Sequence, residues 1–542
     1  MWTPDYSKFV DNKRWYRIPG VLFLATGFVY LSWLFFNLNI DAWYISLPFF
    51  FMHLFTYLMA IVSVINHWQS SYRTQRPMLP DPLLPVAVVV PTYREPIEII
   101  RKTIKSLLHL SYKGQLVIVL SNDDQERLPN GSLEELMGEL SKYWNDINSK
   151  VIAGERQLHL LHTSPHREAK AGNLNQAIAF LRKHYPNLDL ILTQDADEIA
   201  DKDLVSALVG YFSEDSNTAY VQTIKQVDVS PGDPFGNHDV MWYGRTAASR
   251  DASGAMYACG SGVMWRMSAL DSIGGFSTWN MVEDLTTSYE LLANGWSGKY
   301  HYEALSKGLA PEDLPNYFKQ RSVWAIDTMR IFFWDNPFMK PGLTFRQRLQ
   351  FLETPLFYLN GIVVLAMILI TSTFLFFELW PTRSSALVHA IYMLPSFLSL
   401  ELYFILLGGS IPYHRVRQFW VGLAPQFAMA TFAALVNGPN NKPRYIVTRK
   451  ENEYGNYLYL VWPQILVLVL ISLGLLKVIL TTPLYSGFDW ATFFWGFYMA
   501  SFFVQVIKVA LWNYSLEFSL EFVLEKLWEV IPGFSYREEE IE

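Results

Sequence analysis

Residues 188–197 of the chain read LDLILTQDAD, an apolar run followed by two acids that are one residue apart. The first six residues predict a buried strand, so Asp195 and Asp197 would follow its carboxyl end. One intervening residue lets both carboxylates point to the same side of a tight loop. Two such carboxylates can hold a hard cation such as Mg²⁺ while substrate phosphates supply further oxygen ligands. Alone this pattern is weak evidence, because most Asp-x-Asp pairs are solvated turns.

Strands and amphipathic helices alternate around this run, from about Arg76 to Lys340. The predicted strands are 85–92, 115–121, 158–163 and 188–193, and the predicted helices are 96–110, 132–143 and 172–183. This alternation predicts an α/β domain with a mixed, mostly parallel sheet that is covered on both faces. Ligands bind at the carboxyl ends of the strands in such sheets. Those ends carry Thr92–Glu95, Asn122–Asp124 and Asp195–Asp197.

The composition excludes a soluble, a disordered or a fibrous protein. Of the 542 residues 51% are hydrophobic and only 17% are charged, against about 25% charged residues in soluble domains. Most charges fall between about Arg73 and Arg348. Outside the α/β region, six apolar runs are long enough to cross a bilayer: 18–38, 42–65, 355–377, 386–407, 458–480 and 490–507. The sequence therefore predicts an α/β domain inserted into a bundle of about six transmembrane helices.

The basic residues near the apolar runs predict the orientation in the membrane. The first run is preceded by Lys8, Lys13, Arg14 and Arg17, and the second is followed by Arg73 and Arg76. Both ends of this hairpin, and the α/β domain after it, are therefore expected in the cytoplasm, under a plasma (inner) membrane. The net charge of −7 and the lack of a basic stripe argue against nucleic-acid binding.

Two membrane segments have more than one interpretation. Phe419–Val436 is apolar but has basic residues on both sides. We therefore expect an interfacial or re-entrant helix on the cytoplasmic side. Glu401 lies inside the fourth apolar run, where an acid marks a functional site by default. A carboxylate that snorkels or pairs with another helix is an equally good interpretation.

Glu283 and Asp284 stand just before the predicted helix Leu285–Ala293. Acids at this place stabilise a helix N-terminus through its dipole. A carboxylate here could equally be a general base that takes a proton from a hydroxyl group. The residues alone do not separate the two interpretations.

Gln320, Arg321 and Trp324 fall on one side of a predicted helix over 316–331. A Trp beside a cation and an amide is suited to a sugar platform. The alternative is an anchor at the membrane interface, because the third apolar run begins shortly afterwards.

Together these motifs resemble those of the processive family 2 glycosyltransferases of the cellulose synthase type. The resemblance extends from about Leu84 to Lys450. It rests on PTYREP (91–96), NDD (122–124), KAGNLN (170–175), DAD (195–197), VQT (221–223), ACGSG (258–262), VED (282–284), GLAPED (308–313), QRSVW (320–324) and YIVTRK (445–450). Each motif is weak alone, but the ordered set is specific.

The resemblance implies a GT-A-like fold and a role for each motif residue. Asp284 would be the general base for the acceptor hydroxyl, and Asp195 and Asp197 would hold Mg²⁺ or Mn²⁺ on the donor diphosphate. The donor-binding residues would be Thr92, Tyr93, Glu95, Asp123, Lys170, Asp195, Arg321, Thr448 and Lys450, with Asp123 on the uridine. The acceptor-binding residues would be Gly260, Glu283, Gln320 and Trp324. Residues 445–450 would match the family's gating loop.

The implied activity is processive, inverting transfer from a UDP-sugar, with UDP-glucose as the first candidate. The product would be a β-glucan such as cellulose, extruded through the membrane helices. The alternatives are a synthase of another homopolymer (mannan, hyaluronan-like or alginate-like) and a non-processive transferase that acts on a lipid carrier. A channel or scaffold that only binds nucleotide is disfavoured by the complete set of acids. The expected partners are the UDP-sugar, the growing polysaccharide, membrane lipids and accessory export or regulatory subunits.

The sequence departs from the family pattern at three positions. Val323 stands where the family has Arg before the Trp, so a phosphate contact would be missing or supplied by Arg321. In the gating motif Arg449 replaces Pro and Tyr445 replaces Phe. The chain ends at Glu542, which leads us to expect no cyclic-di-GMP-binding module.

The predicted divisions are a hairpin (1–75), the transferase domain (76–340), interfacial helices with two spans and the gating loop (341–453), and the last spans with the tail (454–542).

Overall fold

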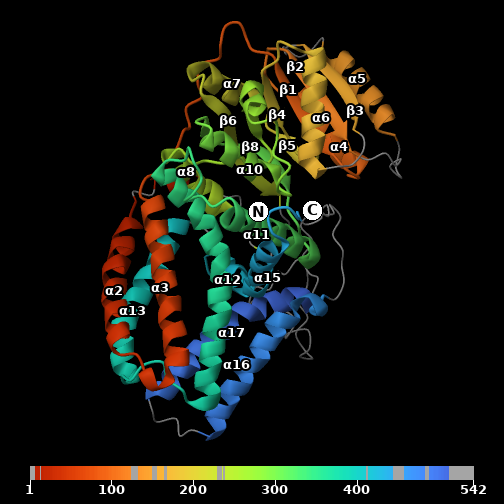
Figure 1. Cartoon of the computed structure of the whole chain (residues 1–542). Coiled ribbons are helices and arrows are strands. Elements are labelled where there is room, and N and C mark those ends of the chain that lie inside the picture. Colours follow the sequence, from red (N-terminus) through yellow and green to blue (C-terminus); the bar gives the residue numbers. More distant parts are fainter. Residues whose placement is uncertain are drawn as a thin grey trace, which may run out of the picture.

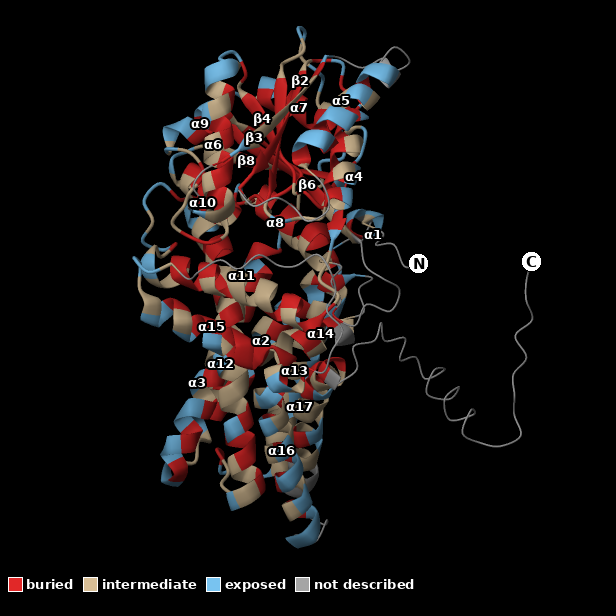
Figure 2. Cartoon of the chain, turned by 90° about the vertical axis from the view of Figure 1, so that its right-hand side faces the viewer, coloured by how far each residue is buried: buried red, intermediate tan, exposed pale blue. Residues whose placement is uncertain are grey.

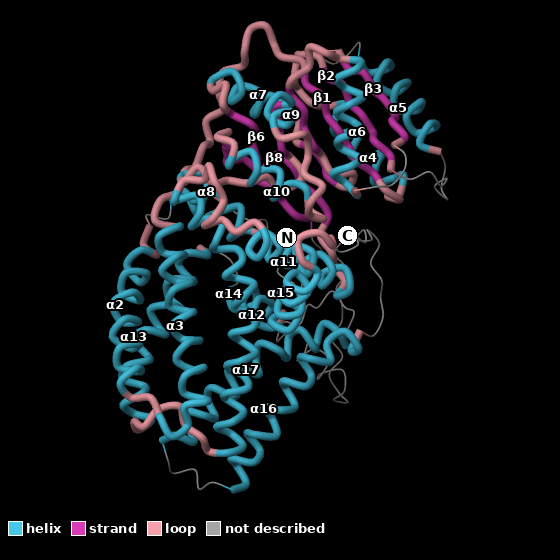
Figure 3. The backbone as a smooth tube through the Cα atoms, in the orientation of Figure 1, coloured by secondary structure: helices cyan, strands magenta, loops and turns pink. Residues whose placement is uncertain are grey.

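A computed structural model describes residues 6–11, 14–123, 132–148, 155–163, 168–228, 235, 239–409, 413–442, 457–481 and 487–511. In Figure 1 an α/β domain stands at one end of a bundle of long helices. Figure 3 shows that the labelled strands lie together in this domain and that the bundle is helical. The predicted combination of an α/β domain with a bundle of long apolar helices is confirmed.

The α/β domain contains an eight-stranded sheet in the order β3-β2-β1-β4-β7-β6-β8-β5. Its strands are β1 Val86–Thr92, β2 Leu116–Asn122, β3 Arg156–His162, β4 Leu190–Thr193, β5 Glu198–Ala200, β6 Thr218–Asp228, β7 Val263–Arg266 and β8 Ser297–Leu309. The pairs among β1, β2, β3 and β4 are parallel, and so is β6 with β8. β7 is antiparallel to both its neighbours, and β5 is antiparallel to β8. The sheet is thus mixed and mostly parallel.

Helices bury both faces of this sheet, which explains why its first strands are apolar throughout. The side chains of β1 alternate between the faces: Val86, Val88 and Val90 belong to one core, and Ala87 and Val89 to the other. The first core includes α4 Ile97–Leu108, α5 Leu133–Asn148 and α7 Leu204–Glu214. The second includes α6 Ala169–His184, α9 Met267–Ser272 and α10 Glu283–Ala293. Figure 2 shows the strands buried between these layers.

Six helices in the described part of the chain are long and apolar enough to cross a membrane. They are α2 Arg17–Phe36, α3 Trp43–Asn66 with the short η1 Ile40–Ala42, α12 Phe345–Phe377, α13 Ala386–Gly408, α16 Trp462–Thr481 with η3 Leu458–Val461, and α17 Gly487–Leu511. All six overlap the apolar runs expected from the sequence.

The ambiguous segment 419–436 falls on two helices, α14 Tyr413–Gly422 and α15 Ala424–Asn437, which meet at a bend of 48°. Such a bend is typical of a re-entrant segment or a broken span, and the cytoplasmic placement stays a prediction. Glu401 of α13 forms an ion pair with Arg417 of α14. This contact matches the interpretation of Glu401 as a carboxylate paired with another helix.

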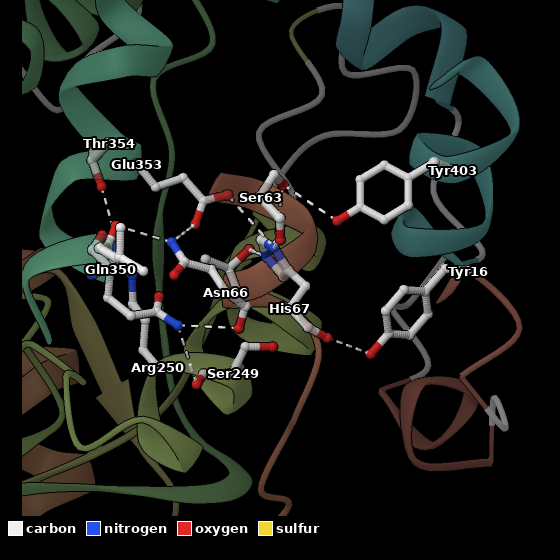
Figure 4. A network of polar contacts seen from close by, with 12 residues as sticks. Tyr16, Ser63, Asn66, His67, Ser249, Arg250, Gln350, Glu353, Thr354 and Tyr403 are labelled. Carbon is white, nitrogen blue, oxygen red and sulfur yellow. Dashed lines mark hydrogen bonds and ion pairs between the residues drawn. The ribbon is translucent and has the colours of Figure 1, made fainter. Parts of the chain in front are cut away.

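A buried polar network joins the membrane bundle to the α/β domain (Figure 4). Asn66, at the end of α3, donates to Glu353 Oε2 of α12 over 2.8 Å. Gln350, also on α12, donates to the Asn66 carbonyl over 3.1 Å. Arg250, on α8 Ala247–Ala252 of the α/β domain, donates to the Gln350 carbonyl and to Thr354 Oγ1 over 2.7 and 2.8 Å. Because buried polar groups need such partners, these contacts hold the domain in place on the bundle.

The helix α11 Leu314–Trp334 lies between the domain and the bundle (Figure 1). Asp313, the last residue of GLAPED, caps its N-terminus by accepting from the Asn316 amide at 2.8 Å. α11 packs along α15 and α12. It therefore carries Gln320, Arg321 and Trp324 to the junction of the two parts.

Candidate active site

Lys170 lies at the centre of the candidate site. Its Nζ contacts Asp195 Oδ1 at 2.7 Å and Glu283 Oε1 at 3.1 Å, and it donates to the Gly260 carbonyl over 2.9 Å. These partners come from the loop after β4, the start of α10 and the loop before β7. Four of the predicted site residues are thus brought together by one ammonium group.

The environment of Lys170 keeps it charged. Burial favours the neutral amine, but Asp195 and Glu283 outweigh it and raise the pKa of Lys170 well above its usual value. The site therefore keeps a cation beside Asp195 at any physiological pH.

Asp284 is a buried carboxylate next to this cluster. Its Oδ1 accepts from the Leu285 amide at 2.5 Å. Burial and the nearby charge of Glu283 raise the pKa of Asp284 to about 8, against the opposing charge of Lys170. A carboxylate that binds a proton near neutral pH is suited to general base chemistry. Since α10 begins at Glu283, the acids also lie where the helix dipole favours them, and the role of Asp284 as general base stays a prediction.

Gly260 is required beside Asp284 for a steric reason. Its φ is +80°, and a Cβ at this position would lie 2.9 Å from Asp284 Oδ2 and 3.2 Å from Lys170 Nζ. Both the backbone conformation and the space exclude a larger residue without movement of the site. This explains the first Gly of the ACGSG motif, Gly260.

Asp195 and Asp197 follow β4 as predicted. Asp195 is half-buried and Asp197 is buried, and the Asp195 amide donates to Ser261 Oγ over 2.9 Å. Within the described ranges no cluster of three or more His, Cys, Asp or Glu side chains could hold a metal by itself. The carboxylates fit a hard divalent cation only as partial ligands, which is how Mg²⁺ binds together with substrate phosphates.

Sequence reasoning missed a second lysine in the site. Lys225 of β6 has its Nζ 3.7 Å from Asp195 Oδ2 and forms an ion pair with Glu198 of β5. Glu198 is fully buried and also accepts from Ser306 Oγ. Burial alone would lower the pKa of Lys225, but Glu198 and Asp195 raise it. Lys225 comes two residues after the VQT motif, but the register of β6 against β8 shifts twice between Thr223 and Lys225, so strand periodicity does not predict its position.

The predicted donor residues of β1 and β2 lie together. Thr92 Oγ1 donates to Glu95 Oε2 over 2.6 Å, and the Tyr93 amide also donates to this oxygen. The Asp123 amide donates to the Thr92 carbonyl over 3.0 Å. Asp123 itself is buried and accepts from Thr163 Oγ1 at 3.0 Å. Asp124, Thr448, Lys450 and the gating motif lie outside the described residues.

On α11 the predicted acceptor residues are half-buried. The Arg321 guanidinium lies 4.6 Å from the centre of the Trp324 ring, a cation–π contact. Arg321 also pairs with Asp239 Oδ1 at 3.3 Å. The structure thus places Arg321 against Trp324 and Asp239, and its predicted phosphate contact stays a prediction.

Two family models match the chain. "Glycosyltransferase like family 2" matches residues 82–326, and "Cellulose synthase" matches residues 270–513. The first covers the whole Lys170 cluster, and the second includes the general-base candidate, α11 and most of the bundle after it. The chain is thus similar to both families, over stretches that together span residues 82–513.

Curated relatives that the chain matches are bacterial cellulose synthases. Cellulose synthase 1 catalytic subunit [UDP-forming] of Komagataeibacter xylinus is 29% identical over 71% of this chain and 50% of its own length. The catalytic subunit of Pseudomonas fluorescens is 26% identical over 70% of this chain and 51% of its own. The chain therefore spans about half the length of these relatives. A solved mannosyltransferase of Pyrobaculum calidifontis aligns over 72% of this chain at 16% identity, with a TM-score of 0.48.

Proposed function

We propose that the chain polymerises a UDP-sugar, with UDP-glucose as the first candidate, into a β-glucan and exports the product. The observation that carries this proposal is the Lys170 cluster, which joins the acids after β4 to the acids of α10. The relatives named UDP-forming cellulose synthases support UDP as the leaving group. Transfer with inversion needs a base on one side of the sugar and a stabilised leaving group on the other.

In this mechanism each side chain has one task. Asp284 takes the proton from the acceptor hydroxyl as that oxygen attacks the anomeric carbon. Lys170, positioned between Asp195 and Glu283, faces the negative charge that builds up on the diphosphate. Lys225 adds a second ammonium on the other oxygen of Asp195.

Asp195 and Asp197 would hold a divalent cation, Mg²⁺ or Mn²⁺, together with the diphosphate. Such a cation, when bound, stabilises the charge on the leaving group. The oxygen-only character of the two carboxylates supports a hard cation over a softer metal.

The acceptor end of the growing glucan would stack on Trp324 and bond to Gln320. Below α11, aromatic rings continue into the bundle. The ring centres of Tyr358 and Phe427 are 5.1 Å apart, and those of Phe357 and Trp420 are 5.6 Å apart. Phe357, Trp420 and Phe427 also line a cavity of about 430 Å³ between α2, α3, α12, α13, α14, α15 and α17. Aromatic rings can stack on sugar faces without fixing a register, so this cavity supports export through the bundle.

The same proposal places the α/β domain in the cytoplasm, under a plasma (inner) membrane. The basic residues that flank the first hairpin support this orientation. Membrane lipids would surround the six apolar helices, and accessory export or regulatory subunits would bind the exposed parts. We also propose the division into hairpin, transferase domain, interfacial region and last spans at residues 75, 340 and 453.

The proposal is tested with the purified chain in lipid nanodiscs. Radiolabelled UDP-sugars are offered singly, and the products are digested with linkage-specific hydrolases. We expect UDP release and a long product from one sugar without an added lipid primer. Asp284→Asn should lower turnover by about 10²–10⁴-fold and leave UDP binding intact. A short lipid-linked product would overturn processivity, and unchanged turnover of Asp284→Asn would overturn the base assignment.

A further inference from the structure

The loop that leads to the general-base candidate is attached to α11. This loop, residues 277–282, is called the base loop below, because Glu283 and Asp284 follow it. The Val282 amide donates to Asp327 Oδ2 over 2.6 Å. Asn280 Nδ2 donates to the Asp327 carbonyl over 3.2 Å. Asp327 of α11 is 1% exposed, so both bonds are shielded from water.

Arg330, one turn after Asp327 on α11, holds the same loop from a second side. Its Nε donates to Asn280 Oδ1 over 2.9 Å, and its Nη2 donates to the Trp279 carbonyl over 3.3 Å. The guanidinium also lies 4.9 Å from the centre of the Trp279 ring. Arg330 is fully buried. Removing it would therefore leave buried acceptors without a donor.

The same guanidinium also binds the segment that follows α15, from its cap residue Gly438 to Asn441. Its Nη1 donates to the carbonyls of Gly438 and Asn441 over 2.9 and 3.0 Å, and its Nη2 donates to the Pro439 carbonyl over 3.1 Å. A cation suits this place, because the helix dipole is negative at the C-terminus of α15. Trp279 adds a bond of 3.0 Å from its Nε1 to the Pro439 carbonyl. The base loop, α11 and the end of α15 thus form one bonded unit.

The acceptor residue Trp324 precedes Asp327 by one turn on the same helix, and Arg330 follows by another turn. Residues three apart on a helix share a face and are separated by about 4.5 Å along the axis. A helix is rigid at this scale. The distance from the sugar platform to the base loop is therefore set by α11 itself and by the bonds of Asp327 and Arg330.

We propose that Asp327 and Arg330 are positioning residues, which set the place of Asp284 relative to the acceptor sugar on Trp324. This inference rests on the proposed function, since it assigns the two residues to the transfer step. Neither residue needs to touch the substrate. Their bonds define how far the carboxylate of Asp284 lies from the hydroxyl group that it deprotonates.

The test compares variants of the full chain in nanodiscs. Asp327→Asn keeps an oxygen that can accept from the Val282 amide, whereas Asp327→Ala removes it. Arg330→Lys keeps the charge but cannot reproduce the fork of a guanidinium. Trp334→Phe is the matched control: it removes another α11–α15 bond, from Trp334 Nε1 to the Ala434 carbonyl at 2.9 Å, away from the base loop.

Turnover, the KM for the donor and the affinity for UDP are measured for each variant. A displacement of about 1 Å costs about 10²-fold in rate. We therefore expect Asp327→Ala and Arg330→Lys to lower kcat by about ten- to a hundred-fold, with little change in KM or UDP affinity. Asp327→Asn and Trp334→Phe should keep most of the wild-type kcat. A purely structural role would instead lower kcat and the number of UDP-binding sites per chain by the same factor, in step with the amount of folded protein.

Amide hydrogen exchange gives a readout that does not depend on turnover. The Val282 amide should exchange faster in Asp327→Ala than in the wild type and Asp327→Asn. Wild-type kcat in both Asp327→Ala and Arg330→Lys would overturn the inference, and so would an equal loss in Trp334→Phe. If Asp327→Ala does not fold, the result for Arg330→Lys decides. Absence of turnover in the wild type with every UDP-sugar, with exchange as expected, would instead overturn the proposed function.

Discussion

Gly260→Ala gives a direct test of the site geometry. The new Cβ would lie 2.9 Å from Asp284 Oδ2, where ordinary van der Waals contact begins at 3.4 Å. The carboxylate would therefore have to move by about half an ångström, and Lys170 Nζ, at 3.2 Å, would move as well. Because a displacement of about 1 Å costs about 10²-fold in rate, half of it predicts a loss in kcat of about tenfold.

The backbone adds a second cost, which a control separates from the first. An Ala at φ +80° is in the left-handed region, which costs about 1–2 kcal/mol of stability. Gly254 has φ +63°, but a Cβ there would meet only Gln347 Nε2, at 3.9 Å. Gly254→Ala should therefore lose a similar amount of stability through its backbone conformation, without a clash in the site.

The assay is UDP release in nanodiscs at saturating donor, with the melting temperature measured in parallel. We expect both variants to lose similar stability and only Gly260→Ala to lose kcat. Wild-type kcat in Gly260→Ala would refute the placement of Asp284 against Gly260. An equal loss in Gly254→Ala would assign the effect to general destabilisation.

Three further predictions concern protons, metal and the second lysine. The pKa of Asp284 is raised to about 8, so its carboxyl group is protonated at lower pH and cannot act as a base. We therefore expect kcat/KM to rise with pH up to about 8. A flat profile from about pH 6 to 9 would contradict the role of Asp284 as base. Chelation with EDTA should abolish transfer. Addition of Mg²⁺ or Mn²⁺ should restore transfer in the wild type but not in Asp195→Ala. Activity that survives chelation would exclude a metal from the transfer step. Lys225→Gln should raise the KM for the donor by about tenfold. It should also lower the melting temperature, because the buried Glu198 loses its ion-pair partner. An unchanged KM would remove Lys225 from the donor site.

Local sequence patterns were sufficient for the strands β1 to β4 and for the membrane helices, but they did not predict β5 to β8. The apolar run before Asp195 and the alternation of strands and helices predicted a mixed sheet with acids at its strand ends, because a strand that is buried on both faces must be apolar throughout. The length of the apolar runs predicted the six membrane helices, since the bilayer thickness sets the length of a spanning helix. The ordered motifs indicated the candidate acids.

The contacts between distant segments appear only in the tertiary structure. Lys225 and Glu198 come from β6 and β5, which are separated in the sheet by β8, and nothing near either residue in the sequence predicts their ion pair. Arg330 is 108 residues from Gly438, whose carbonyl it binds. The sequence showed that Val323 replaces an Arg of the family motif, but only the fold shows that the neighbouring Arg321 pairs with Asp239.

The sequence by itself thus determined the strands β1 to β4, which helices are apolar enough to span a membrane, and which acids follow those strands; the strands β5 to β8 were not predicted. Only the folded chain decided which cation lies beside which acid, and which residues hold the base loop. The physical reason is that periodicity and length act within a few turns of one element. An ion pair or a hydrogen bond depends on where the packing of the whole chain brings two distant atoms.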